Sequence, residues 1–149
     1  MDRQLIERRI AQFPEACRHA GLKVTHQRMA VYSMLAGTDN HPTPEDVYSA
    51  IRTQLPSLSL GTVYKILDQF QKHGFLRKVS TEGHVARYDA NMDSHHHLVC
   101  SGCGKIQDIH MEHALPSVPP VPESAEFAVK SCDILFHGFC KSCQASQAA

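Results

Sequence analysis

Apolar residues recur at helical spacing through the first half of the chain, and this pattern predicts a series of helices. Thr25, Thr43 and Ser59 each precede such a run and are suited to cap a helix N-terminus. Pro14 interrupts the first run, which predicts a kink or two short helices there. The predicted helices cover residues 3–20, 25–36, 43–56 and 59–73.

The residues after the last of these helices predict a β-hairpin. The stretches FLRKVS and HVARY are strand-like and flank the turn sequence Thr81-Glu82-Gly83. Three or four short helices followed by a hairpin is the layout of a winged helix-turn-helix. We therefore expect a domain of that type at the N-terminus.

From residue 95 the pattern changes to short strands. The stretches HHHLVC and KIQDIHM are joined by a turn at residues 101–104, and residues 126–139 predict a third strand. Four of the eight prolines lie within residues 114–125, which excludes a long regular helix there. The tail from Gln144 is small and polar and predicts no regular structure. The expected fold class is α+β, with a small C-terminal α/β domain whose sheet is antiparallel.

Charge divides the chain in the same place as the pattern does. Residues 1–88 hold 12 Lys/Arg and 8 Asp/Glu, and the remainder holds 3 and 7, so charges of +4 and −4 sum to zero. A neutral chain argues against a nucleic-acid binder, whereas a basic N-terminal half suits one. We expect a DNA-binding domain over residues 1–88, a hinge over 89–94, and a metal-binding domain over 95–149, and the family resemblance given below adds dimerisation to the role of the last.

No targeting feature is predicted. The first residues are charged and lack the apolar stretch of a signal peptide, and no segment reaches the roughly 18 apolar residues of a membrane span. We therefore expect a cytoplasmic protein without a membrane partner. In that reducing compartment, paired cysteines favour metal ligation over disulfides.

Four cysteines form two CxxC pairs: Cys100 with Cys103, and Cys140 with Cys143. Two such knuckles supply four thiolates at tetrahedral positions about 2.3 Å from Zn²⁺. A closed site of this kind is structural and would pin the third strand to the first two. The alternatives are unpaired buried cysteines and a redox pair, but no βαβ pattern accompanies either motif.

A second group of candidate ligands combines imidazole and carboxylate. His95 and His97 share one face of a strand because side chains alternate along it. Asp108 lies on the next strand, and Asp89 precedes the first. Such a mixture suits Fe²⁺, Mn²⁺ or Zn²⁺. The alternative is a polar strand face whose histidines are hydrogen-bonded.

The fourth predicted helix presents polar residues of the types that contact bases and phosphates in a major groove. A solvated helix face is the alternative. The candidate DNA contacts on this helix, with two arginines from elsewhere, are Gly61, Thr62, Tyr64, Lys65, Gln69, Arg28 and Arg77.

Together these motifs resemble the ferric uptake regulator family over nearly the whole chain. The matching stretches are GLKVTHQRMAVY, HPTPEDVY, SLGTVYKIL, ARYD, HHHLVCSGCGKIQDI and FHGFCKSC. The resemblance implies homodimeric, metal-dependent repressors that bind an inverted-repeat DNA operator, with no small organic substrate. It implies a structural Zn²⁺ on the four cysteines and a regulatory Fe²⁺ or Mn²⁺ held by His41, Asp89, His95, His97 and Asp108.

The resemblance also points to a branch of the family. The peroxide-sensing branch carries Asp where Asp89 and Asp108 stand, whereas the iron-sensing branch typically carries Glu. In the peroxide-sensing branch, bound Fe²⁺ reacts with hydrogen peroxide and a ligand histidine is oxidised. By resemblance, the oxidised residues would be His41 and His95.

Three features depart from the family pattern. Lys65 stands where peroxide sensors tend to carry Asn and iron sensors a basic residue. A third metal site of many iron sensors is absent, since its positions hold Ser94, Leu115 and Cys132. The proline-rich residues 116–122 replace a helix usual in the dimerisation domain.

The resulting prediction is a repressor that senses peroxide, and not an enzyme. The alternative within the family is a repressor that responds to iron or manganese level alone. Outside it, a metal-dependent hydrolase would need a general base, and none stands out. A zinc-ribbon interaction module without DNA binding would leave the recognition-helix motif unexplained.

Overall fold

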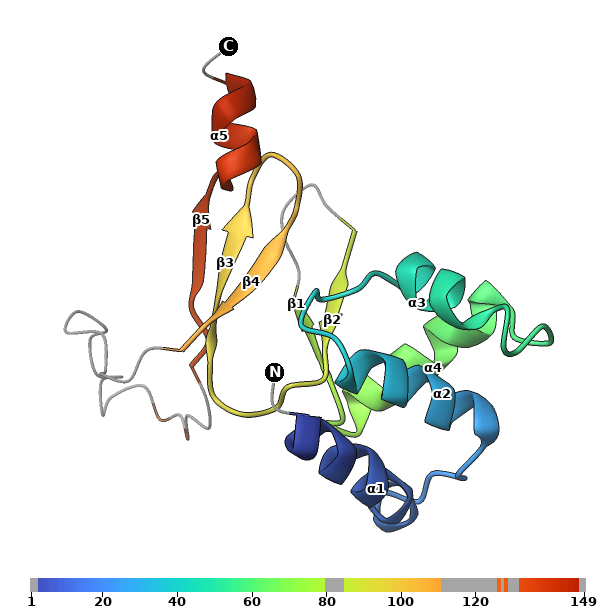
Figure 1. The fold of residues 1–149 in the computed structure, drawn as a ribbon. Helices are drawn as coiled ribbons and strands as arrows, with labels where there is room; N and C mark the ends of the chain where they lie inside the picture. The colour runs from blue at the N-terminus through green and yellow to red at the C-terminus, as the bar shows by residue number, and fades with distance from the viewer. Residues whose placement is uncertain (1–2, 80–84, 111–125, 127, 129–131, 148–149) are drawn as a thin grey trace. The chain divides into compact units, whose positions relative to one another are not determined.

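The computed structural model describes residues 3–79, 85–110, 126, 128 and 132–147. The chain divides into two compact units, Met1–Met92 and Asp93–Ala149, and each unit is described by itself. The first contains four helices and a two-stranded sheet, and the second contains a three-stranded sheet and a short helix among the described residues (Figure 1). No described helix combines the length and apolar character needed to cross a bilayer.

The helices of the first unit begin where their caps predict. α2 and α4 follow Thr25 and Ser59, whose hydroxyls accept hydrogen bonds from the backbone N–H three residues on. At α3, Thr43 and Asp46 form a reciprocal capping box, and Pro44 occupies the first turn. The bounds are α1 Arg3–His19, α2 His26–Ala36, α3 Pro44–Ile51 and α4 Leu60–Lys72.

The structure decides between one helix and two at Pro14, and it corrects one helix end. α1 is a single helix through Pro14, and the burial of Phe13 and Cys17 in the core offsets the hydrogen bond that proline cannot donate. α3 ends at Ile51 and does not reach Pro56. The residue before a proline is disfavoured in helical geometry, so Leu55 leaves the helix through a turn but remains in the core.

An aromatic cluster forms the centre of the first unit. The rings of Phe13 and Tyr32 stack with centroids 3.7 Å apart, and Phe70 and Phe75 meet Phe13 edge-on. α4 contributes Val63, Ile66, Leu67 and Phe70 to this core. Because that face is buried, the opposite face of α4 is left to solvent.

A short hairpin follows α4, as the winged helix-turn-helix pattern predicts. β1, Arg77–Val79, pairs antiparallel with β2, Arg87–Asp89, and places Arg77 opposite Asp89. The predicted turn at residues 81–83 lies outside the described residues.

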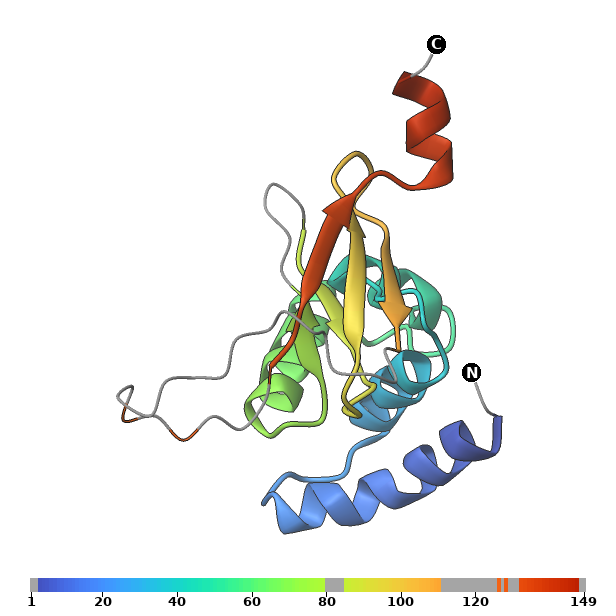
Figure 2. The ribbon, with the colours of Figure 1, turned by 90° about the vertical axis from the view of Figure 1, so that its left-hand side faces the viewer.

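The second unit is built around β3. β3, His96–Cys100, lies between β4, Ile106–Ile109, and β5, Leu135–Gly138 (Figure 2). β4 pairs antiparallel and β5 pairs parallel, so the sheet is mixed and the prediction of a wholly antiparallel sheet was wrong. Parallel pairing needs a long crossover, and residues 110–134 supply the length between β4 and β5.

The C-terminal residues differ from the pattern-based prediction in two ways. The described part of the third strand is shorter than residues 126–139. The tail forms α5, Lys141–Gln147, where no regular structure was predicted. Its sequence lacks proline and glycine, and the N–H of Gln144 donates to the carbonyl of Cys140 as the first helical turn closes. The proline-rich residues 116–122 lie outside the described residues.

Candidate metal centres

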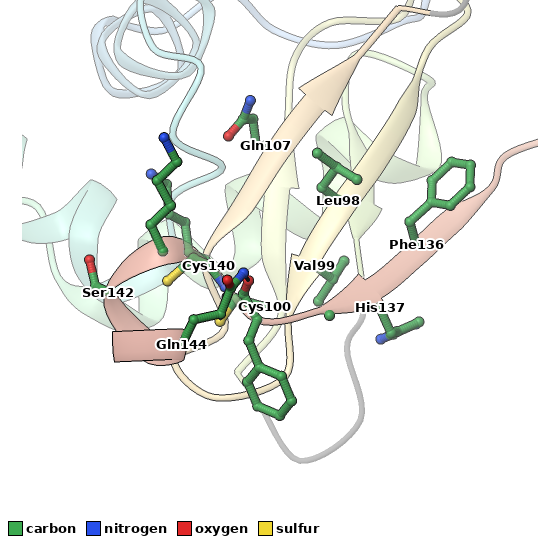
Figure 3. A pocket seen from close by; sticks show the side chains of 13 residues that line it. Leu98, Val99, Cys100, Gln107, Phe136, His137, Cys140, Ser142 and Gln144 are labelled. Atoms are coloured by element: carbon green, nitrogen blue, oxygen red, sulfur yellow. Dashed lines mark hydrogen bonds between the residues drawn. The ribbon is translucent and has the colours of Figure 1, made fainter. Parts of the chain in front are cut away.

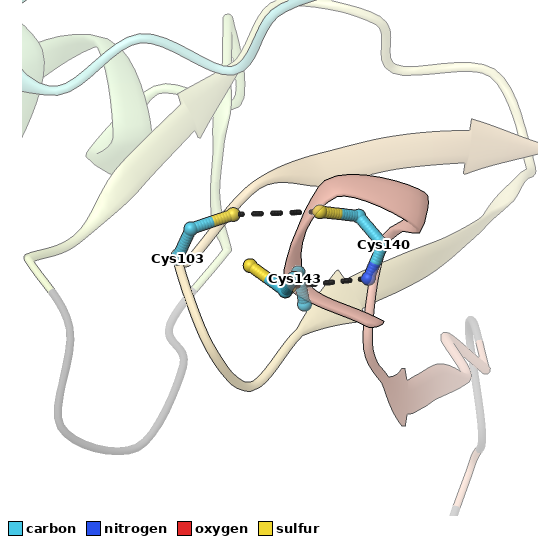
Figure 4. A group of neighbouring side chains, drawn as sticks. Cys103, Cys140 and Cys143 are labelled. Atoms are coloured by element: carbon cyan, nitrogen blue, oxygen red, sulfur yellow. Dashed lines mark hydrogen bonds between the residues drawn. The ribbon is translucent and has the colours of Figure 1, made fainter. Parts of the chain in front are cut away.

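The four predicted thiolates converge at one end of the second unit. Cys100 and Cys103 come from the end of β3 and the turn after it, and Cys140 and Cys143 flank the start of α5. Their sulfur atoms lie within 4.8 Å of one another, and the Sγ atoms of Cys103 and Cys140 are 3.8 Å apart (Figure 4). Four sulfurs bound tetrahedrally at about 2.3 Å would be separated by about 3.8 Å. The cluster therefore fits a tetrahedral Zn²⁺.

Local backbone geometry shapes this cluster. The N–H of Cys140 donates to the sulfur of Cys100 at 3.3 Å, and backbone donors of this kind lower the pKa of that thiol to about 6. Hydrogen bonds from neighbouring thiols raise the pKa of Cys143 to about 12. Thiols crowded in this way ionise together only beside a cation. A Cβ atom at Gly102 would lie 3.0 Å from the sulfur of Cys143, so a larger residue there would require the thiol or the turn to shift.

An apolar hollow borders the cysteine cluster. Its volume is about 450 Å³, and its lining includes Leu98, Phe136 and Phe139 beside Cys100 and Cys140 (Figure 3). Leu98 and Phe139 are about two-fifths exposed. The second unit therefore presents an apolar surface next to its thiolates.

A second polar group of the same unit lies at the opposite end of β3. The Nε2 atoms of His95 and His97 are 3.0 Å apart, and both side chains are buried. Asp108 pairs with His97 across the sheet, and its Oδ1 lies 3.5 Å and 3.6 Å from the two ring nitrogens. Ligand atoms held about 2.1 Å from one metal ion are separated by about 3.0–3.4 Å. These three side chains therefore fit a shared cation.

The ring of His95 is oriented by the backbone. Its Nδ1 lies 2.8 Å from the carbonyl oxygen of Asp93. A histidine that donates from Nδ1 to a carbonyl presents the lone pair of Nε2, as metal-binding histidines commonly do. The ring centroid of His110 lies 5.8 Å from that of His95. No sequence motif singled out His110 as a site residue.

The first unit contributes a separate pair of candidate ligands. His41 precedes α3 and Asp89 ends β2, and their ligand atoms lie within 4.8 Å of each other. The Nδ1 atom of His41 lies 3.0 Å from the carbonyl oxygen of Asp39, which repeats the arrangement at His95. The Oδ1 atom of Asp89 accepts from the N–H of Asn91 at 2.7 Å. Spacing alone would leave His41 as a loop histidine, and only the family resemblance selected it.

The candidate DNA contacts on α4 are mostly at the surface. Gly61, Tyr64 and Lys65 are exposed, and Thr62 and Gln69 are half-buried. The hydroxyl of Tyr64 donates to Glu45 of α3 at 2.7 Å, a bond that raises the pKa of the phenol. The Nη2 atom of Arg28 donates to the Oε1 atom of Gln69 at 2.6 Å.

Arg77 is placed differently from the other candidate DNA contacts. Its Nε lies 3.9 Å from the Oδ2 of Asp89, and its side chain is only 20% exposed. This geometry directs Arg77 toward a candidate metal ligand, and gives no support to its predicted contact with phosphate.

Comparison with known proteins identifies the relatives of this fold and these motifs. Residues 19–137 match the ferric uptake regulator family. The peroxide-responsive repressor PerR of Staphylococcus epidermidis is 30% identical over 144 residues, which cover 93% of each chain. The solved structure of the Helicobacter pylori ferric uptake regulator Fur is 27% identical, covers 93% of each chain and gives a TM-score of 0.73.

The ferric uptake regulator of Francisella tularensis, solved with iron, is 26% identical and gives a TM-score of 0.68. That match covers 83% of this chain and 96% of the other. The match to the family model extends over most of the sequence and covers the larger part of both compact units. The chain therefore belongs to the ferric uptake regulator family, whose members are dimeric DNA-binding transcriptional regulators and not enzymes.

Proposed function

We propose that the protein is a cytoplasmic, metal-dependent repressor that senses peroxide through oxidation of a ligand histidine. The observation that carries this proposal is the composition of its two ligand groups. Both contain only imidazole and carboxylate, and both carboxylates are the short side chains Asp89 and Asp108. The likeness to a peroxide-responsive repressor supports the same function.

In this proposal, the pair His41 and Asp89 and the set His95, His97 and Asp108 hold one Fe²⁺ or Mn²⁺. The hard oxygen and nitrogen donors suit those metals, whereas the cysteine cluster retains a structural Zn²⁺. Ligands from both compact units stabilise one arrangement of the units over others, because metal binds that arrangement best. DNA and metal affinity are then reciprocally linked.

Peroxide would act on the ligand histidines themselves. Bound Fe²⁺ would supply the electron transfer that activates hydrogen peroxide. One peroxide oxygen would be added to a ring carbon of His41 or His95, and the other would leave as water. Because Nδ1 of each ring lies against a backbone carbonyl, Nε2 would be the atom that each ring offers to the metal. The altered ring would bind metal less well, and the repressor would leave its operator.

Two copies of the chain would read an inverted-repeat operator. The exposed face of α4, with Tyr64 and Lys65, would enter the major groove, and a two-fold dimer would match two half-sites. The apolar surface of the second unit, including Leu98 and Phe139, would serve as the dimer contact. Because residues 1–88 carry a charge of only +4, tight DNA binding should depend on the dimer and on the geometry set by the metal, not on bulk charge.

The deciding experiment loads the zinc-containing protein with Fe²⁺ or Mn²⁺ and adds hydrogen peroxide. We expect one added oxygen atom on peptides containing His41 or His95, and loss of DNA binding, with Fe²⁺ only. Unmodified histidines together with unchanged DNA affinity in the Fe²⁺ sample would refute peroxide sensing.

A second candidate is a repressor that responds to iron or manganese level alone. It is favoured by Lys65, an exposed base on α4 of the kind that iron-sensing members carry by resemblance. For this function, peroxide would leave the Fe²⁺ protein unmodified, while removal of either metal would release DNA.

A further inference from the structure

The loop that carries His41 is held against β2 by two hydrogen bonds. The N–H of Tyr88 donates to the carbonyl of Pro42 at 3.1 Å, a backbone contact that most residues at position 88 would provide. The Nη1 of Arg87 donates to the carbonyl of His41, also at 3.1 Å. The second contact depends on the side chain, so it is the one that the sequence specifies.

His41 adopts a backbone conformation that needs such support. Its φ is +49°, in the left-handed region that side chains other than glycine seldom adopt. Residues held there persist when their surroundings fix them from several directions. The ring of His41 is fixed through Nδ1 by the Asp39 carbonyl, and its own carbonyl is fixed by Arg87. Hydrogen bonds within the first unit therefore hold both the side chain and the backbone carbonyl of His41.

The charge of Arg87 is also engaged within this unit. Its Nη1 lies 3.9 Å from the Oδ2 of Asp46, the acidic residue of the α3 capping box, and its side chain is 23% exposed. One nitrogen, Nη1, thus lies near both the His41 carbonyl and the start of α3. The planar guanidinium fixes the direction of its N–H groups, whereas the ammonium of lysine is a mobile point charge that would retain these contacts only in part.

We propose that Arg87 is a positioning residue for the regulatory metal. It holds His41 in its left-handed conformation beside Asp89, so that this ligand pair exists before metal binds. The proposal rests on the proposed function, because it assumes that His41 and Asp89 bind the regulatory metal. Arg87 itself contacts no metal, and acts only through His41.

The test compares Arg87→Met, Arg87→Lys and the control Lys78→Met, which removes an exposed cation from the same hairpin. Zinc content and far-UV circular dichroism establish that each variant is folded. Titration with Mn²⁺ alone then gives the affinity. We expect Mn²⁺ binding to weaken about tenfold or more in Arg87→Met, less in Arg87→Lys, and not in Lys78→Met. Equal affinity in Arg87→Met and Lys78→Met would overturn the proposal.

A double-mutant cycle with His41→Ala separates positioning from general destabilisation. If Arg87 acts through His41, Arg87→Met has no added effect on Mn²⁺ affinity in the His41→Ala background. A full additional loss there would refute the proposal. A separate outcome concerns the proposed function. If His41→Ala and Asp89→Ala both bind Mn²⁺ like the unaltered protein, the proposed regulatory site itself is rejected, and the role of Arg87 is rejected with it.

A contact between Arg87 and DNA phosphate predicts a different result. That role would weaken DNA binding at saturating Mn²⁺ and reduce its salt dependence. Under our proposal, both quantities stay near their original values once Mn²⁺ is saturating. Reduced salt dependence with unchanged Mn²⁺ affinity would assign Arg87 to DNA and reject the positioning role.

Discussion

The length of a single carboxylate side chain is the residue-scale feature that separates the two candidate functions. Asp108 places one oxygen 3.5–3.6 Å from both buried imidazoles. Glutamate would add one methylene group and displace the carboxylate by about 1.5 Å. The set of donor atoms would be retained, but its geometry around the metal would change.

We therefore expect Asp108→Glu to keep metal-dependent DNA binding while peroxide adds oxygen to His41 and His95 more slowly. Mass spectrometry after a timed exposure of the Fe²⁺ protein measures the effect. Asp68→Glu, an equivalent change on the exposed side of α4, should oxidise at the original rate. An unchanged rate in Asp108→Glu would contradict the argument from side-chain length.

Gly102 provides a second residue-scale prediction. In Gly102→Ala, the new Cβ would lie 3.0 Å from the sulfur and 3.2 Å from the Cβ of Cys143, so the turn or the thiolate must shift. We expect Zn²⁺ to be held about tenfold less tightly. The control is Gly138→Ala, where the new Cβ would meet no atom within 4 Å beyond the glycine and its chain neighbours. A zinc-release assay with a coloured chelator should separate the two, and similar release from both would contradict the prediction.

At the scale of elements, α3 connects the loop that carries His41 to α4, the candidate recognition helix. It begins two residues after Pro42, and its Glu45 accepts the hydroxyl of Tyr64 on α4. The capping box of Thr43 and Asp46 fixes where α3 starts, with bonds of 2.9 Å and 3.2 Å. The position of a candidate DNA contact thus depends on a helix that starts beside a candidate metal ligand.

Thr43→Ala removes the hydroxyl that caps α3, so we expect the free energy of unfolding to fall by about 1 kcal/mol. Urea denaturation of the metal-free protein measures this change. Thr53→Ala, at an exposed turn position after the same helix, should lower the free energy of unfolding by much less. Equal losses in the two variants would show that the cap contributes little.

Elements governed by local signals were predictable from sequence, and those governed by distant contacts were not. The caps at Thr25, Thr43 and Ser59 depend on residues within one turn, and they mark three helix starts correctly. The parallel pairing of β5 depends on a crossover of many residues, which alternation cannot reveal.

The same distinction applies to the candidate sites. The CxxC spacing and the alternation of His95 and His97 predicted which side chains meet. The left-handed conformation of His41 and the approach of Arg77 to Asp89 arise from tertiary structure, which a single sequence does not encode in any local pattern.

At the scale of the whole molecule, the proposed regulatory metal draws ligands from both compact units, and this predicts a shared stability increment. Mn²⁺ at about one hundred times its Kd should add about 2.7 kcal/mol to the free energy of unfolding. His41→Ala and Asp108→Ala alter different units, yet each should remove most of this increment. Thermal unfolding with and without Mn²⁺ measures it, and a full increment in His41→Ala would argue against a joint site.

β3 has a further consequence for handling the protein. This five-residue strand ends at Cys100, a candidate zinc ligand, and His97 lies three positions before that end. Removal of zinc would take away the link between α5 and the end of β3, and so would loosen the strand that also carries the imidazole of His97. Loss of zinc during purification could then be mistaken for a regulatory effect. A zinc-depleted sample would fail to respond to Mn²⁺ even though all the proposed regulatory ligands were chemically intact.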